Sequence, residues 1–339
     1  MSLTNPSILL ERNLEAFENS KLLILNHEDD DFAVSASKIA DSVTALALDF
    51  QHHQTLKGHN YVDCHFGTHL NKEGDGFDDI IIYFSKTKAL SQYLLDMAQH
   101  LIKNNGYIWV VGENNSGIKT LPKMLTSTCY KSDSARRCSL YYSQIEQPTR
   151  HFAIEDYLEQ FQLSFNQSSL HVCTLPGVFA GQKLDAGTEL LLQTLVNNQQ
   201  GRILDFGCGS GVLTAAIALN NPDAQIEAVD INAMALAACK LTMDANNLQV
   251  NVYPSNGLQE VQPGLQAIIS NPPFHDGLVT TTDIATQFVA DSKKVLNQGG
   301  LWQIVANAHL PYGEAIAASF GTICVENSNN KFKVYLQNR

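Results

Sequence analysis

Residues 202–230 read RILDFGCGSGVLTAAIALNNPDAQIEAVD, and this stretch decides the fold of the second half of the chain. Its apolar start leads into Asp205. Glycines then occupy three alternate positions, Gly207, Gly209 and Gly211. Apolar residues at helical spacing follow, and a second apolar run, residues 226–229, ends at Asp230. The order strand, glycine turn, helix, strand predicts half of a doubly wound α/β sheet, whose ligands bind at the carboxyl ends of the strands.

The spacing of the glycines indicates which ligand binds. A dinucleotide-binding turn has the pattern G-x-G-x-x-G and holds a pyrophosphate, whereas this loop reads D-x-G-x-G-x-G. Asp205 would place negative charge where a pyrophosphate should lie, but it suits the cationic amino-acid end of S-adenosylmethionine. Asp230 is in register to accept both ribose hydroxyls. We therefore predict an S-adenosylmethionine site that also includes Ile231, in preference to a nicotinamide dehydrogenase or a glycine turn that only packs a helix.

A second motif, Asn271-Pro272-Pro273-Phe274, predicts the chemistry. It follows the apolar run 267–269, which reads as the fourth strand, so it lies at the cofactor edge of the sheet. The exocyclic amine of a base is planar and a poor nucleophile. The Asn271 oxygen and the Pro272 carbonyl can accept its two N–H bonds and favour a pyramidal nitrogen. Phe274 offers a face on which a base that has left its stack can lie. Asn271, Pro272 and Phe274 are thus the predicted catalytic residues.

Composition bounds the class of protein. The chain has 339 residues and 44% hydrophobic content, enough for two domains. Its formal net charge of −12 means that any contact with RNA must be a local patch. We expect no signal peptide and no membrane span, because no long uncharged apolar run is present. Seven cysteines without a C-x-x-C pair argue against a zinc site or a disulfide framework. A cytoplasmic, metal-free protein with reduced thiols is expected.

The first half of the chain repeats the second in a degenerate form. Residues 22–25 occupy the place of the cofactor strand, but the following NHEDDD contains no glycine. Residues 80–82 match 267–269, but Tyr83-Phe84-Ser85-Lys86 replaces the catalytic motif. We predict two tandem Rossmann-like methyltransferase folds of class I, of which the N-terminal copy has lost its cofactor site; an unrelated α/β domain is the alternative. The predicted boundaries are 1–147 for the first domain, 148–170 for a linker with a short helix, and 171–339 for the catalytic domain.

The remaining elements are predicted from periodicity and from breaker residues. In the first half, strands are expected at 21–25, 43–50, 79–84, 107–111 and 138–145, and helices at 8–17, 89–102 and about 117–125. In the second half, strands are expected at 250–253, 301–306 and 331–336, and helices at 235–245 and 283–296. Ahead of the cofactor strand, Asp185 can cap a helix, and residues 172–187 form either a lid over the cofactor or the leading helix of the domain.

Basic residues gather in the first half. Residues 86–137 hold eight basic side chains against three acidic ones, whereas the chain from Asn166 onward holds eight against thirteen. Phosphate contacts supply most sequence-independent affinity for RNA, so the first domain is the better candidate to hold it. A solvated charged face is the alternative. The predicted RNA-binding residues are Lys86, Lys88, Lys119, Lys123, Arg136 and Arg137.

Over nearly its whole length the chain resembles the RsmC-type ribosomal RNA small subunit methyltransferases, which methylate N2 of one guanine of 16S rRNA. The resemblance rests on GENNSG at 112–117, DSARRC at 133–138, TLPGVF at 174–179, residues 205–211, SNPPFHDG at 270–277, and VANA at 305–308 with LPY at 310–312. It implies a monomeric enzyme of ribosome biogenesis that acts on the assembled small subunit. Carried over by position, the cofactor contacts are Asp205, Gly207, Gly209, Asp230 and Asn256, while Asn271 and Phe274 hold the guanine.

Some features leave alternatives open. Gly181-Gln182-Lys183 departs from the family pattern as an insertion, so the geometry of the predicted lid stays open. A sister family with a similar tandem layout methylates guanine N2 of 23S rRNA. Related catalytic loops serve adenine-N6 and glutamine-N5 transfer. From a different class, the chain could be mainly an RNA-binding factor of ribosome assembly whose methyl transfer is incidental.

Overall fold

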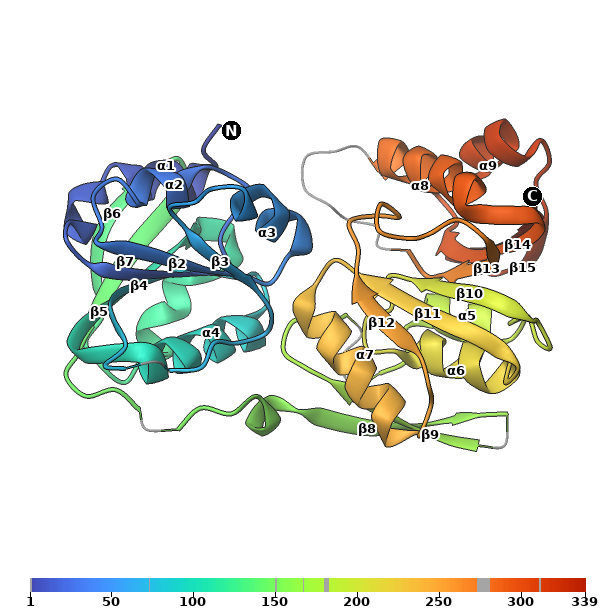
Figure 1. The fold of residues 1–339 in the computed structure, drawn as a ribbon, viewed down its shortest axis with the longest axis horizontal. Helices are drawn as coiled ribbons and strands as arrows, with labels where there is room; N and C mark the ends of the chain where they lie inside the picture. Colours follow the sequence, from blue (N-terminus) through green and yellow to red (C-terminus); the bar gives the residue numbers. More distant parts are fainter. Residues whose placement is uncertain are drawn as a thin grey trace. The chain divides into compact units, whose positions relative to one another are not determined.

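A computed structural model describes residues 2–72, 74–149, 151–166, 168–179, 183–272, 281–310 and 312–339. The chain forms two compact units, Met1–Leu158 and Glu159–Arg339 (Figure 1).

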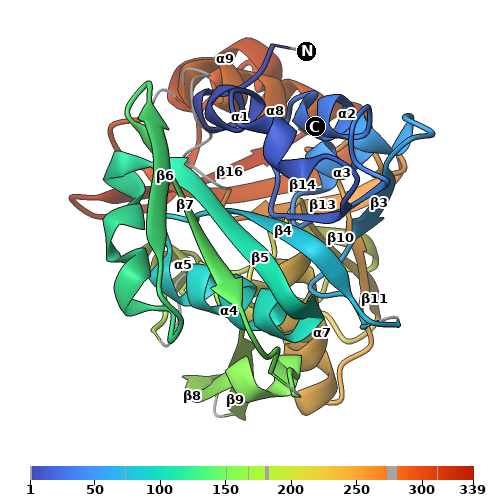
Figure 2. The ribbon, with the colours of Figure 1, turned by 90° about the vertical axis from the view of Figure 1, so that its left-hand side faces the viewer.

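Unit 1 is built on a seven-stranded sheet of order β3-β2-β1-β4-β5-β7-β6, in which β7 runs antiparallel to both of its neighbours (Figure 2). Its elements are α1 (Asn5–Glu11), η1 (Leu14–Phe17), β1 (Lys21–Leu25), α2 (Phe32–Ala36), β2 (Ser42–Ala47), α3 (Phe50–Lys57), β3 (Asp63–Phe66), β4 (Phe77–Tyr83), α4 (Lys88–Leu101), β5 (Ile102–Glu113), η2 (Asn114–Ser116), η3 (Ile118–Lys123), β6 (Tyr130–Ala135), β7 (Cys138–Ile145) and η4 (Ile154–Tyr157).

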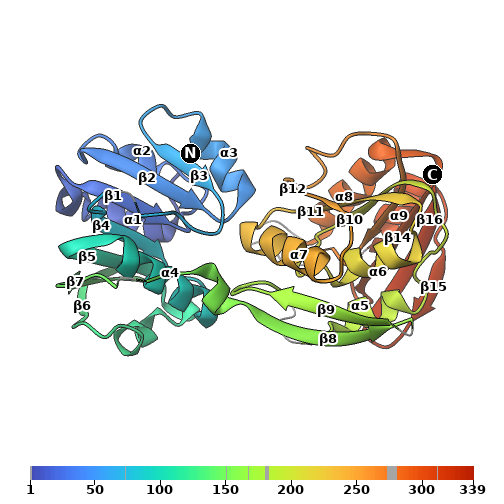
Figure 3. The same ribbon diagram turned by 60° about the horizontal axis from the view of Figure 1, so that its bottom comes forward.

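Unit 2 repeats this sheet in the order β12-β11-β10-β13-β14-β16-β15 and adds the hairpin β8–β9, which packs on α7 (Figure 3). Its elements are β8 (Glu159–Phe165), β9 (Ser168–Thr174), α5 (Ala186–Leu192), β10 (Gly201–Phe206), α6 (Val212–Asn220), β11 (Ala224–Asp230), α7 (Ala233–Ala245), β12 (Asn251–Pro254), β13 (Leu265–Ser270), α8 (Thr281–Val295), β14 (Leu296–Asn307), α9 (Tyr312–Phe320), β15 (Val325–Ser328) and β16 (Phe332–Asn338).

Each sheet carries helices on both faces, so its central strands are apolar on both sides. In unit 2, α5, α6 and α7 cover one face and α8 and α9 the other (Figure 1). Ile268 and Trp302 on neighbouring strands are fully buried against Val289 of α8. Parallel strands that are buried on both faces place their carboxyl ends, rather than their faces, within reach of a ligand.

The two sheets match residue by residue, which confirms the tandem fold. Asn26 and Gly207 both begin the loop after the first strand with positive φ, 55° and 75°. Both donate their backbone N–H to the second strand, at 3.0 Å to the Leu46 carbonyl and 2.9 Å to the Val229 carbonyl. Since strand order and loop geometry agree, the first half is a copy of the same fold.

Several predicted boundaries were wrong for identifiable reasons. The strand predicted at 43–50 ends at Ala47, because Asp49 caps α3 through the backbone N–H groups of Gln51 and His52. The helix predicted near 117–125 is a 3-10 segment that contains Pro122. Residues 159–165, expected within the linker, form β8 and pair with β9. The strands β3, β6 and β15 and the helix α9 were not predicted.

Candidate active site

The glycine loop lies between β10 and α6 and has the backbone geometry that only glycine adopts easily. Gly207, Gly209 and Gly211 have φ of 75°, 53° and 81°. A Cβ on Gly211 would lie 3.0 Å from the Cys239 Sγ and 3.1 Å from the Cys239 Cα, so this glycine allows α6 to pack closely on α7. A Cβ on Gly209 would meet nothing within 4 Å. The loop is therefore open to a ligand at Gly209 and closed by packing at Gly211.

Asp205, at the end of β10, is fully buried. The Thr214 hydroxyl donates a hydrogen bond of 2.5 Å to its Oδ2, while Oδ1 is buried and has no partner within the part of the chain that the structure describes. Burial raises the pKa of the Asp205 carboxyl to about 7; the Thr214 hydrogen bond opposes that shift, and the nearby Asp230 charge adds to it. A buried carboxylate oxygen without a partner fits a cation bound at this loop.

Asp230, at the end of β11, is held by the backbone on both of its oxygens. Gly209 N–H donates to Oδ2 at 3.1 Å and Asn232 N–H donates to Oδ1 at 2.9 Å. Carboxylate oxygens at this position are of the chemical type that accepts hydrogen bonds from ribose hydroxyls. Asn256 follows β12, whose last residue pairs with Asp230, and the Asn256 N–H donates to Glu260 Oε2 at 3.0 Å. The register therefore brings Asn256 beside Asp230, with Ile231 between Asp230 and the cap of α7.

Asn271 follows β13 and is hydrogen-bonded to the start of α5. Its Nδ2 donates to Asp185 Oδ2 and to Thr188 Oγ1, both at 2.9 Å. Its Oδ1 is buried and accepts no hydrogen bond from any residue in the described ranges. Pro272 is buried directly after it, while Pro273 and Phe274 lie outside the described residues. The amide oxygen is thus available to a substrate amine.

The sheet order explains why these residues meet. β12, β11, β10 and β13 are consecutive parallel strands, so the residues that follow them share one edge. The same register in unit 1 places Ile24 at the position of Asp205, Ala47 at that of Asp230 and Tyr83 at that of Asn271. Unit 1 therefore has no carboxylate at the positions of Asp205 and Asp230 and no side-chain amide at that of Asn271.

The six predicted RNA-binding residues of unit 1 are exposed and lie at one edge of its sheet. Lys86 and Lys88 follow β4, and Lys119 and Lys123 follow β5. Arg136 and Arg137 form the turn between β6 and β7, which lies beside the end of β5 because Cys138 pairs with Glu113. Acidic side chains share this edge nearer β1 and β2: Glu28, Asp29 and Asp49. The basic surface therefore covers the β4–β6 side of the edge.

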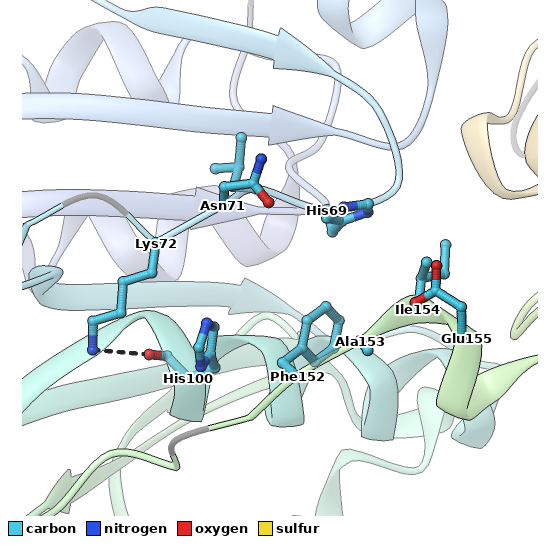
Figure 4. Close-up of a pocket in the computed structure, with 9 residues that line it drawn as sticks. His69, Asn71, Lys72, His100, Phe152, Ala153, Ile154 and Glu155 are labelled. Carbon is cyan, nitrogen blue, oxygen red and sulfur yellow. Dashed lines mark hydrogen bonds between the residues drawn. The ribbon is translucent and has the colours of Figure 1, made fainter.

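Each unit contains a cavity lined by described residues. One of about 240 Å³ in unit 1 is lined by His69, Lys72, His100, Phe152 and neighbouring residues, and there Lys72 Nζ donates to the His100 carbonyl at 3.1 Å (Figure 4). It lies at the carboxyl end of α4, away from the basic edge. The other, of about 540 Å³ in unit 2, is lined by Asn307, Ala308, His309, Asn330 and Lys331. It follows β14 at the same sheet edge as Asn271.

Sequence reasoning missed Thr188 and Thr214, and it gave Asp185 only the role of helix cap. That cap is present, with the Gly187 and Thr188 N–H groups at 2.9 and 3.0 Å from Asp185 Oδ2.

No cluster of three or more potential metal ligands occurs among the described residues. No helix within the described ranges is long and apolar enough to cross a membrane.

Comparison with known proteins places the chain in a family. A family model described as "Methyltransferase small domain" matches residues 169–336, and one described as "Methyltransferase small domain N-terminal" matches residues 7–161. The chain is 48% identical over 340 residues to the ribosomal RNA small subunit methyltransferase C of Shewanella denitrificans, and 47% identical over 339 residues to that of Shewanella loihica. Each alignment covers 98% of both chains.

A solved structure has the same fold. The T. thermophilus 16S rRNA N2 methyltransferase (RsmC), in complex with AdoMet and guanosine, matches with a TM-score of 0.87 at 18% identity. The match covers 99% of this chain and 92% of that one. A likeness at this level of identity establishes the tandem architecture.

Proposed function

Because the chain belongs to the ribosomal RNA small subunit methyltransferase C family, we propose that it methylates the exocyclic N2 amine of a guanine in 16S rRNA, with the assembled small subunit as its substrate. The chain is an S-adenosylmethionine-dependent methyltransferase. The observation that carries the proposal is the buried, unpartnered Oδ1 of Asn271 at the cofactor edge of unit 2.

Five groups at this edge fit the cofactor. Bound S-adenosylmethionine supplies a methyl group on a positively charged sulfur. Asp205 lies beneath the glycine loop and would attract the cationic amino-acid end, and Gly209 leaves open space above the backbone. Asp230 would accept the ribose hydroxyls, and Ile231 and Asn256 would border the adenine.

Asn271 would act on the guanine amine. Its buried Oδ1 would accept one N–H of that amine, and the Pro272 carbonyl would accept the other. These two hydrogen bonds localise the nitrogen lone pair, which in the free base is delocalised into the ring. Once methylated, the nitrogen is cationic and its proton is acidic, so solvent suffices as the base. Phe274, which lies outside the described residues, is assigned the stacking face for the base.

Unit 1 is proposed to hold RNA. The six basic residues after β4, after β5 and in the β6–β7 turn form one exposed surface, and they would contact phosphates without reading sequence. The described groups of the cofactor and amine sites all belong to unit 2 of one chain, so we also propose that the enzyme works as a monomer, in the cytoplasm.

The change Asn271→Ala tests the assignment. Removal of the acceptor should lower methyl transfer by about 10²-fold or more, by analogy with loss of one preorganised hydrogen bond to a transition state. Binding of 16S rRNA should persist. Near-normal turnover by the variant would contradict the amine-acceptor role. A variant that lost RNA binding together with methyl transfer would also contradict the assignment, because Asn271 would then act in RNA binding.

A further inference from the structure

The catalytic amide does not stand alone: two residues from the start of α5 fix its orientation. Asp185 Oδ2 and Thr188 Oγ1 each lie 2.9 Å from Asn271 Nδ2. A primary amide has two N–H bonds, and these two acceptors use both of them. The amide oxygen is left buried and without a partner in the described part of the chain. The two contacts therefore decide which end of the amide faces the substrate.

The carboxylate makes this choice unambiguous. An ionised carboxylate only accepts hydrogen bonds, so the Asn271 atom that faces Asp185 must be the NH₂ group. The Asp185 side chain is itself fixed, since its Oδ2 also accepts from the backbone N–H groups of Gly187 and Thr188. Gly187 permits this close approach: a Cβ there would lie 3.0 Å from that same carboxylate oxygen.

The degenerate copy shows which part of this arrangement belongs to the fold. Tyr83 occupies the Asn271 position in unit 1, and its hydroxyl lies 2.7 Å from the hydroxyl of Ser7. Ser7 is the third residue of α1, as Thr188 is the third residue of α5, and α1 packs on β5 and β7 as α5 packs on β14 and β16. A link between the fourth strand and the leading helix is thus common to both copies. Among the described residues, only unit 2 has a carboxylate bonded at this position and a side-chain amide oxygen left without a partner.

From these contacts we propose that Asp185 and Thr188 are positioning residues for methyl transfer, which act by holding the Asn271 amide with its oxygen toward the guanine amine. The inference rests on the proposed function and deepens it. Without the pair, the amide can rotate by half a turn and present N–H bonds to an amine that also carries N–H bonds. Such a site would still bind both substrates but would lose its acceptor in a fraction of molecules.

The competing role is structural, because Asp185 also caps α5. Loss of a cap costs about 1 kcal/mol wherever it occurs, so the cap of α3 provides a matched control: Asp49 accepts from two backbone N–H groups in the same way. Asp185→Ala should lower kcat by about tenfold or more, with little change in KM for S-adenosylmethionine. The Asp49→Ala variant should lose a similar amount of unfolding free energy, while its kcat should equal that of the parent enzyme. Asp185→Asn retains a side-chain oxygen for the cap and for the amide, so it should restore much of the activity.

Thr188 offers a test that leaves the cap intact, since only its backbone N–H takes part in the cap. Thr188→Val removes the acceptor at nearly constant volume and should lower kcat several-fold. Thr188→Ser keeps the hydroxyl and should behave like the parent enzyme. Equal kcat in the valine and serine variants would overturn the role of Thr188.

A double-mutant cycle decides whether both residues act through Asn271. In the Asn271→Ala background, Asp185→Ala and Thr188→Val should lower kcat no further, because the group that they orient is gone. Further losses equal to those of the single variants would overturn the proposal. Turnover is measured on small subunits that lack the methyl group, with labelled S-adenosylmethionine.

A readout without catalysis separates this inference from the proposed function. The two Nδ2 protons of Asn271, assigned by NMR with Asn271→Asp as reference, should exchange slowly with solvent in the parent protein and faster in Asp185→Ala. Equal exchange in both proteins would overturn the inference. If the parent protein transferred no methyl group to any ribosomal RNA, the proposed function would fail, while the exchange data would still decide whether the amide is held.

Discussion

Thr214 Oγ1 lies 2.5 Å from Asp205 Oδ2, so the first turn of α6 donates a hydrogen bond to a carboxyl group that has no contact with solvent. This hydrogen bond joins β10, which precedes the glycine loop, to α6, which follows it. It also leaves the second carboxyl oxygen, Oδ1, without a partner in the described part of the chain. The site thus keeps a buried acidic group beneath its loop, and its protonation should govern both folding and cofactor binding.

The pH dependence of stability follows from that burial. The folded-state pKa of Asp205 is raised to about 7 from 3.8. A raised pKa contributes stability that is complete below the unfolded pKa and is lost as pH rises through the folded pKa. For the cofactor-free protein, the loss between pH 4 and 7 should amount to roughly 4 kcal/mol at most. Asp205→Asn should remove it, so urea unfolding of the two proteins from pH 4 to 8 should diverge; parallel curves would contradict the burial argument.

Cofactor affinity should depend on the same proton with the opposite sign. Only the ionised Asp205 carboxylate attracts the ammonium group of S-adenosylmethionine, so affinity should rise between pH 6 and 8. Binding at pH 6.5 should release a proton, which calorimetry in buffers of different ionisation enthalpy detects. The Asp205→Asn variant should bind more weakly and release no such proton. An affinity that is flat across this range in the parent protein would mean that Asp205 only anchors α6.

The two glycines of the loop should respond differently to alanine. At Gly211 the added Cβ meets Cys239 at 3.0–3.1 Å and φ is 81°, so Gly211→Ala should cost about 2–3 kcal/mol of unfolding free energy. At Gly209 φ is 53° and space is open, so the cost should be about 1 kcal/mol. Gly209→Ala should instead weaken S-adenosylmethionine binding, because its methyl group occupies the ligand side of the loop. Thermal unfolding measures the stability of the two variants, and calorimetry measures their affinity for S-adenosylmethionine. A larger loss of stability in Gly209→Ala than in Gly211→Ala would contradict the packing argument.

Reversal of the two positive charges in the β6–β7 turn should weaken RNA binding. Arg136→Glu/Arg137→Glu should lower affinity for 16S rRNA and reduce the slope of log K against log salt by about two, one for each lost phosphate contact. Cofactor affinity should be unchanged. Lys38→Glu/Lys57→Glu is the matched control, since it changes the charge equally on exposed residues away from the basic edge. Equal RNA affinity for both double variants would reduce the basic surface to a solvated face.

The sequence order strand, glycine loop, helix, strand made it possible to predict which edge of the unit 2 sheet carries the candidate site. An apolar run ends at or just before each of three residues, Asp205, Asp230 and Asn271. Parallel strands bring such positions to one edge of the sheet, independently of the conformation of the loops. The duplication was also predictable, because residues 22–25 and 80–82 occupy the places of the cofactor strand and of residues 267–269 in a repeated order of elements.

The support behind the site could not be predicted in the same way. Asp185 and Thr188 lie more than eighty positions before Asn271, and only the packing of α5 on β14 and β16 brings them close. Sequence periodicity specifies that a helix has a buried face, but not which strand end lies above its first turn. The 3-10 segment η3 and the hairpin β8–β9 were missed because a proline and tertiary pairing override local propensity there.

Methylation of guanine N2 in the small subunit is tested most directly by transfer of labelled methyl from S-adenosylmethionine to three substrates isolated without the modification: small ribosomal subunits, naked 16S rRNA and large subunits. We expect label on N2-methylguanine in small-subunit material alone, and loss of that label with Asn271→Ala. Label on large-subunit RNA would retain the amine chemistry and overturn the assigned substrate. The absence of label from every RNA would contradict the proposed function, because the Asn271 amide would then act on an amine outside ribosomal RNA.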